Sequence, residues 1–401
     1  MIYMIIYACL RGVSNMNIRI NFNERIISLL FIIGLFFPSS SAYIINGKNK
    51  LVLSFFILIF FILILFVKNG VNVSGVKYAI LIISLTLLFT LLGLFKYNEI
   101  AINTSLLIQI IIFSLILMIS YTKIKITKNI IYLFNIVNII NIALGLLIIL
   151  NNMSVKDFFM KYYSAFYPEL MSYMLMNNKP VLYFGSHSIA GFFIYLFFYM
   201  NFLLYKKNKS KLNLIFILLN IFLLLNIKSV TSIILFAVAT IQLFYYFRKS
   251  KKALLIILPL IIYIFVKNSS YIYLMIDKIF SSDINGFAGR YSDSGVFQQD
   301  FEYLKNNLLP IGVLTLDQLY YTDNGFILNF IAGSVFLVFT IYRGLYSLFT
   351  HNIKNRKTSL WLFILFFSFE WAFPNLYYIR TLYFLPFLVV FVMYTESIEA
   401  K

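Results

Sequence analysis

The chain has 401 residues, of which 62% are hydrophobic and only 12% are charged. Soluble domains carry about twice that share of charged residues, so this composition excludes a soluble globular protein. The net charge of +19 does not indicate a nucleic-acid partner, because the basic residues lie in short clusters between apolar runs, as the positive-inside rule predicts.

Apolar runs recur from end to end, each of about the 17–22 residues that cross a hydrocarbon core. They predict an all-α fold: one polytopic transmembrane helical bundle over residues 1–401, with about twelve spans. The predicted spans are 26–45, 51–67, 78–95, 100–121, 129–150, 183–205, 212–227, 230–247, 253–266, 324–347, 359–376 and 381–395.

The basic clusters predict the orientation of the bundle. KKNKSK, FRKSKK and HNIKNRK all fall on one side of the twelve spans when the N-terminus is placed inside. Both termini are then cytoplasmic, every cytoplasmic connection is short, and His351 lies as a solvated residue in a basic turn. Two long loops face outward, at about 151–182 and 267–323.

The second outer loop is the longest polar interval of the chain. It holds half of the 14 acidic residues, namely Asp277, Asp283, Asp293, Asp300, Glu302, Asp317 and Asp323. From Asp293 or Ser294 onward, Phe297, Phe301, Leu304 and Leu308 recur at helical spacing. This pattern predicts an amphipathic helix over 294–308 that lies on the bilayer surface or against the bundle.

Arg290 in GFAGRYSDSG is the first candidate for chemistry. Its guanidinium stays charged and presents a rigid fork of donors to phosphate oxygens, and Gly289 beside it lets the backbone approach a ligand. The alternative is an arginine that binds lipid headgroups or a carboxylate of the loop. The neighbouring glycines and carboxylates favour the functional interpretation.

Tyr321 and Asp323 precede the tenth span in YYTDNGFILNF. Asp323 at the membrane edge is positioned to accept a proton or a hydrogen bond from a sugar hydroxyl. The competing interpretation is a helix N-cap, since Asp before an apolar run is a common cap signal. On the residues alone, the cap is favoured.

Lys179 and His187 mark a polar start of the sixth span, in KPVLYFGSHSIAGFF. Both are candidates for binding substrate or phosphate. For His187 the alternative is a hydrogen bond between helices. The sole cysteine, Cys9, excludes an internal disulfide and a cysteine-based metal cluster, and we expect neither a metal nor another cofactor.

Glu370 inside the eleventh span and Arg380 at the start of the twelfth are costly charges in a membrane. They predict a wet cavity or a structural ion pair with each other. Tyr377, Tyr378 and Tyr383 are candidate platforms for sugar stacking, and an interfacial aromatic belt is the simpler interpretation.

The number of spans and the enlarged outer loops resemble the Wzy-type O-antigen or capsule repeat-unit polymerases, which are related to O-antigen ligases. The local resemblance lies in GRYSDSGVFQQDFEYLKNNLLPIGV and TDNGFILNFIAGSVF. Arg290 matches the family's loop arginine. Asp323 and Asn324 stand where ligases carry His-Asn, which favours the polymerase branch, and the Trp expected after the loop arginine is missing.

The resemblance implies glycosyl transfer on the outer face of a bacterial cytoplasmic membrane. Glycans on undecaprenyl diphosphate would be donor and acceptor, and a flippase and a chain-length regulator would be partners. Arg290, assisted by Arg380 or Lys179, would bind the departing diphosphate without a metal. Asp323 or Asp300 would accept the proton or a hydrogen bond of the hydroxyl on the acceptor glycan. The alternatives are a lipid-linked oligosaccharide flippase or other transporter, and an O-antigen ligase.

Overall fold

The structure is a computed structural model of the 401-residue chain. It describes residues 22–38, 44–45, 48–49, 51–96, 101–164, 168–248, 269–280, 309–315 and 324–398, together with positions 259, 266, 298, 302 and 305.

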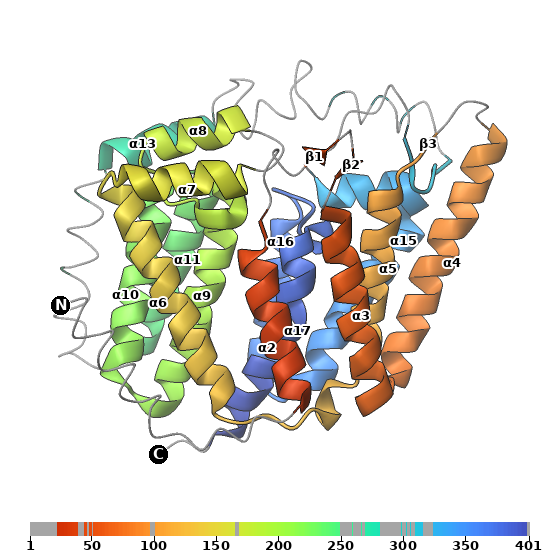
Figure 1. The fold of residues 1–401 in the computed structure, drawn as a ribbon, viewed down its shortest axis with the longest axis horizontal. Helices are drawn as coiled ribbons and strands as arrows, with labels where there is room; N and C mark the ends of the chain where they lie inside the picture. Colours follow the sequence, from red (N-terminus) through yellow and green to blue (C-terminus); the bar gives the residue numbers. More distant parts are fainter. Residues whose placement is uncertain are drawn as a thin grey trace.

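Long helices stand side by side and form most of the molecule (Figure 1). They are α2 (Phe22–Phe36), α3 (Leu51–Asn69), α4 (Val73–Lys96), α5 (Thr104–Met118), α6 (Asn129–Ile149), α9 (His187–Asn208), α10 (Lys211–Asn226), α11 (Val230–Phe247), α15 (Gly325–Asn352), α16 (Arg356–Phe369) and α17 (Ile379–Ser397).

Three shorter helices lie across the end of the bundle that is drawn at the top of Figure 1. They are α7 (Met153–Tyr163), α8 (Pro168–Met176) and α13 (Ser269–Phe280). We call this the upper end. The opposite, lower end carries the turns at 119–128, 209–210 and 353–355.

The described strands are two-residue pairs, both drawn at the upper end. β1 (Ile44–Ile45) pairs antiparallel with β2 (Lys48–Asn49), and β3 (Ala101–Ile102) pairs antiparallel with β4 (Leu314–Thr315). Short 3-10 turns cover Tyr121–Lys123, Leu182–Phe184 and Asn375–Tyr377.

The helix α9 is buried along most of its length, and its sequence is apolar on every side, which is typical of a fully buried helix. Its phenylalanines meet those of neighbouring helices, with ring centroids 5.6 Å apart for Phe134 and Phe197 and 4.2 Å apart for Phe192 and Phe369. The outer helix α4 instead leaves a broad row of leucines and isoleucines exposed, as expected for a face that meets lipid.

Six helices are long and apolar enough to cross a membrane: α4, α6, α9, α11, α15 and α17. The prediction of an all-α bundle of membrane type is confirmed. Eleven predicted spans coincide with a helix, while of the ninth, 253–266, the structure describes only positions 259 and 266, which are both helical. Several of these helices are shorter than 18 residues, so the count of twelve stays a prediction.

Several predicted span boundaries were wrong, among them the three that follow. α2 ends at Phe36 rather than 45, because Pro38 follows it and cannot continue a helix. α9 begins at His187 rather than 183, after a turn in which Gly185 has a φ of +72°. α16 ends at Phe369 rather than 376, and Pro374 lies in the loop that follows.

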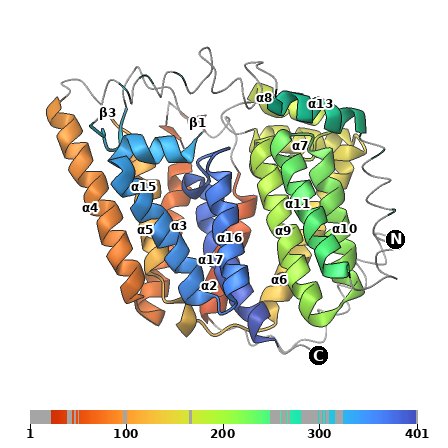
Figure 2. The ribbon, with the colours of Figure 1, turned by 180° about the vertical axis from the view of Figure 1, so that it is seen from behind.

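The tenth span was predicted as one continuous helix but contains a break. Gly333 and Ser334 have non-helical backbone angles inside α15, and Ser334 has a φ of 59° and a ψ of −169°. The first part of α15 therefore runs across the upper end, and the remainder descends through the bundle (Figure 2).

The two predicted outer loops both contain structure. The first holds α7 and α8, and the second holds α13. Of the helix predicted over 294–308, positions 298, 302 and 305 are helical, and Gln298 Nε2 donates to Glu302 Oε1 at 3.2 Å. The rest of that predicted helix lies outside the described residues.

Candidate functional site

Five of the predicted site residues lie outside the described residues: Arg290, Asp300, Asp323, Gly289 and Tyr321. The structure nevertheless describes where their loop returns to the bundle. It also describes Arg380, Lys179 and His187, which belong to segments at the upper end.

The segment 309–315 fixes the end of the second outer loop to the bundle. Ile311 and Val313 are buried, and their backbone N–H groups donate to Ile331 O at 3.0 Å and to Thr90 Oγ1 at 3.1 Å. Gly312 has a φ of +66°, and a side chain there would collide with Thr90. The loop that carries Arg290 therefore returns to a fixed place between α4 and the first part of α15.

Asn324 caps α15 and is the first described residue after Thr315, the last residue of β4. Its Oδ1 accepts hydrogen bonds from the backbone N–H groups of Phe326 at 2.9 Å and Ile327 at 3.1 Å. These are the orphan donors of the first helical turn. The cap that the sequence assigned to Asp323 thus belongs to Asn324.

 

The N–H of Gly325 and the side chain of Glu370 join α15 to the loop after α16. Gly325 N–H donates to Glu370 O at 2.8 Å, and the buried Glu370 carboxylate accepts from Leu376 N–H at 2.8 Å and lies 3.4 Å from the Tyr342 hydroxyl. A Cβ on Gly325 would lie 1.8 Å from Glu370 Oε2. Only glycine permits this approach.

Arg380 is 2% exposed and is bonded to the end of α2. Its Nη1 donates to Gly34 O at 2.9 Å and Leu35 O at 2.7 Å, and its Nη2 donates to Phe37 O at 3.0 Å. A cation at these carbonyls satisfies the unpaired acceptors of the helix C-terminus and its negative dipole end. The guanidinium therefore joins the first described helix to the last.

The ion pair predicted between Glu370 and Arg380 is not formed, because each group has the other partners just described. The two charges are both buried near the upper end, but each is satisfied by hydrogen bonds from or to the backbone. This arrangement offsets part of the cost of burying a charge.

Asn329 and Tyr342 form a buried polar cluster with Tyr377 that sequence reasoning missed. The Tyr377 hydroxyl donates to Asn329 Oδ1, and Asn329 Nδ2 lies 3.4 Å from the Tyr342 hydroxyl. Burial raises the pKa of Tyr377 well above its usual value, so its hydroxyl keeps the proton that it donates. The sequence signal for this cluster was Asn329 itself, because an asparagine within an apolar run needs a hydrogen-bond partner.

Burial contradicts the interpretation as an interfacial belt for Tyr377 and Tyr383, while Tyr378 is half-buried. Tyr377 and Tyr383 are buried, and the Tyr378 hydroxyl donates to Phe184 O at 3.0 Å while accepting from Arg380 Nε at 3.2 Å. Tyr378 thereby connects the Arg380 segment to the turn that precedes α9, which begins at His187.

Lys179 and Lys156 belong to the layer of short helices at the upper end. Lys179 Nζ lies 5.4 Å from the centre of the Tyr173 ring. Lys156, which sequence reasoning did not single out, is buried and donates to Asn151 Oδ1 at 2.6 Å and Asn178 Oδ1 at 2.5 Å. Lys156 therefore fastens α7 to the turns on either side of the α7–α8 layer.

Among the described residues, no three His, Cys, Asp or Glu side chains come together as a metal site would require. Comparison of the chain with protein-family models, curated protein sequences and solved structures finds no match. The site is therefore interpreted from its own residues: a fixed loop anchor, a capped and broken helix, and buried charges at one end of the bundle.

Proposed function

We propose that the chain is a multi-pass glycosyltransferase of a bacterial cytoplasmic membrane that joins lipid-linked oligosaccharide repeat units at its upper end. The observation that carries this proposal is the anchored segment 309–315, which bonds to Ile331 of α15 and to Thr90 of α4. In the sequence, Arg290 precedes this anchor and Asp323 follows it, directly before the helix cap Asn324.

The chemistry requires positive charge on the departing diphosphate and an acceptor for the proton of the attacking hydroxyl. Arg290 supplies the charge and Asp323 or Asp300 the acceptor. Lys179 remains a candidate for assistance at the diphosphate. Arg380 is less available for that role than the sequence indicated, because its Nη1 and Nη2 are bonded to carbonyls in and directly after the last turn of α2.

The proposal is tested by Arg290→Ala in a strain whose own copy of the gene is deleted. Glycan chain length on gels is the readout, and the amount of protein in the membrane is measured in parallel. We expect the long polymer to disappear, leaving single repeats, while the membrane amount is unchanged. Lys305→Ala, on the same loop, is the matched control and keeps the polymer. Normal chain lengths from Arg290→Ala would exclude the assignment.

A lipid-linked oligosaccharide flippase is the second candidate, and the break in α15 favours it. Transporters build substrate sites from discontinuous helices with buried polar groups, and α15 is broken at Gly333 and Ser334 close to the buried Asn329. The deletion strain separates the candidates: loss of a polymerase leaves surface glycan of one repeat, and loss of a flippase leaves none. An O-antigen ligase, disfavoured by Asp323, would leave polymer on the carrier lipid.

A further inference from the structure

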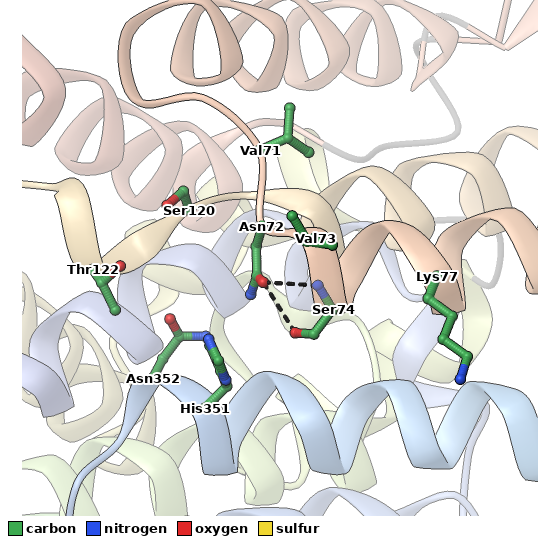
Figure 3. Close-up of a pocket in the computed structure, with 9 residues that line it drawn as sticks. All are labelled: Val71, Asn72, Val73, Ser74, Lys77, Ser120, Thr122, His351 and Asn352. Carbon is green, nitrogen blue, oxygen red and sulfur yellow. Dashed lines mark hydrogen bonds between the residues drawn. The ribbon is translucent and has the colours of Figure 1, made fainter.

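A cavity of about 600 Å³ opens at the lower end, away from the site proposed above (Figure 3). Its walls come from three segments that are distant in sequence: residues 71–77 at the start of α4, residues 120–122 after α5, and the last two residues of α15. The cavity belongs to the end where the basic clusters lie.

Asn352, one of the lining residues, carries an unsatisfied acceptor. The residue is 5% exposed, and its Nδ2 donates to Leu348 O at 2.8 Å, which fixes which atom of the amide is the oxygen. Its Oδ1 is buried and has no hydrogen-bond partner. Figure 3 shows this oxygen turned toward the segment that carries Ser120 and Thr122. A buried acceptor without a partner is costly, so a ligand that donates a hydrogen bond here is favoured.

The remaining polar groups favour an anion. Lys77 and His351 line the cavity, and none of its nine lining residues is acidic. A second ammonium lies next to it, because Lys123 Nζ is 3.4 Å from the position of a Cβ on Gly70. The first turn of α4 adds its positive dipole end. The ligand is thus an anion that also carries a hydrogen-bond donor.

The position of the cavity indicates how such a ligand arrives. Val71 and Val73 on its rim are exposed, Val73 to 85%, and they continue into the exposed apolar face of α4. A polar cavity with an apolar rim, at the end of a bundle rich in Lys and Arg, matches the headgroup level of an anionic bilayer surface.

We propose that this cavity binds a phosphate ester that carries a free hydroxyl, as in a glycerol phosphate headgroup. The cations neutralise the phosphate, and the hydroxyl donates to Asn352 Oδ1. The same chemistry has two sources, an anionic phospholipid such as phosphatidylglycerol or soluble glycerol phosphate, and the experiment distinguishes them.

The test uses the purified full chain in bilayer nanodiscs that contain either phosphatidylglycerol or phosphatidylmethanol, and native mass spectrometry counts the retained lipid. The two lipids carry the same charge, but only the first has headgroup hydroxyls. We expect the wild-type chain to retain phosphatidylglycerol about fivefold better, as one added hydrogen bond allows. Asn352→Leu brings this preference below about twofold.

Lys77→Gln, at an exposed position, lowers retention of both lipids by about fivefold, whereas the control Lys125→Gln at the same end does not. Retention that survives excess glycerol phosphate supports the lipid as the source, and displacement supports the soluble ester. The proposal is overturned if the wild type shows no preference between the lipids, or if Lys77→Gln and Lys125→Gln behave alike. Both outcomes are independent of whether the chain polymerises glycans.

Discussion

Gly325 lies against the carboxylate of Glu370 with no room for a side chain. Gly325→Ala must displace the buried Glu370 carboxylate from its hydrogen-bonded position, and we expect it to lower the free energy of unfolding by about 3 kcal/mol. Unfolding in detergent, followed by loss of helical signal, measures the change. Gly145→Ala is the control, because its nearest neighbour is the flexible end of Leu223, at 2.9 Å. Equal losses in the two variants would contradict the interpretation.

Substitution of Arg380 tests whether this residue has a structural or a catalytic role. A lysine cannot reproduce the fork that bonds the carbonyls of Gly34, Leu35 and Phe37 at the end of α2, so Arg380→Lys is expected to cost about 2 kcal/mol of stability. Arg343→Lys, at an exposed position, is the control and is expected to change little. If Arg380→Lys keeps its stability but loses the polymer, Arg380 binds substrate as the sequence indicated.

The sequence identified Arg380 as unusual but not what it contacts. Its partner Gly34 lies 346 positions away, and nothing in the composition of either segment specifies that contact. Asn324 was recognisable as a cap residue, yet the adjacent Asp323 is an equally good one by type. Only the backbone geometry at the start of α15 shows that the cap is Asn324.

At the scale of a helix, the break in α15 is the feature that sequence periodicity did not predict. Ser334 occupies a backbone region that is populated almost exclusively by glycine and costs about 1–3 kcal/mol for other residues. Gly/Ser pairs are among the places where helices kink, but glycine is also frequent in membrane helices generally, so the pair alone did not distinguish a kink from a continuous span.

Ser334→Gly is therefore expected to raise the free energy of unfolding by about 1 kcal/mol. Ser334→Ala keeps the Cβ that causes the strain, and it is expected to leave stability unchanged or slightly lower. Thermal unfolding of both variants in the same detergent compares them. A stabilisation by alanine equal to that by glycine would show that the hydroxyl, rather than the backbone angle, determines the effect.

At the scale of the whole molecule, the sequence predicted a helical bundle and most helix positions because each apolar run must satisfy its own backbone in lipid. It did not predict which helices are neighbours, since leucine-rich and isoleucine-rich faces are nearly interchangeable. The order of helices in space depends on particular contacts, such as the stacked rings of Phe31 and Phe387, whose centroids are 3.8 Å apart.

The predicted orientation can be checked with single cysteines, because Cys9 is the sole natural one. In a Cys9→Ser background, Asn177→Cys at the upper end should react with a membrane-impermeant maleimide in intact cells. Lys125→Cys at the lower end should react only after the cells are made permeable, because the positive-inside rule places it in the cytoplasm. The reversed labelling pattern would exclude the proposed orientation and an outward-facing site.

The bond between Arg380 and the end of α2 has a consequence for how the chain is made. The ribosome synthesises α2 long before α17. The carbonyls of Gly34 and Leu35 therefore cannot accept hydrogen bonds from Arg380 until synthesis is nearly complete. The helices α9, α10 and α11, by contrast, are consecutive neighbours and assemble as they emerge. Until α17 is synthesised, α2 lacks its final packing partner, so we expect it to stay in contact with the insertion machinery. A chain whose synthesis stops before Arg380 leaves α2 incompletely packed, and we expect membrane proteases to degrade it.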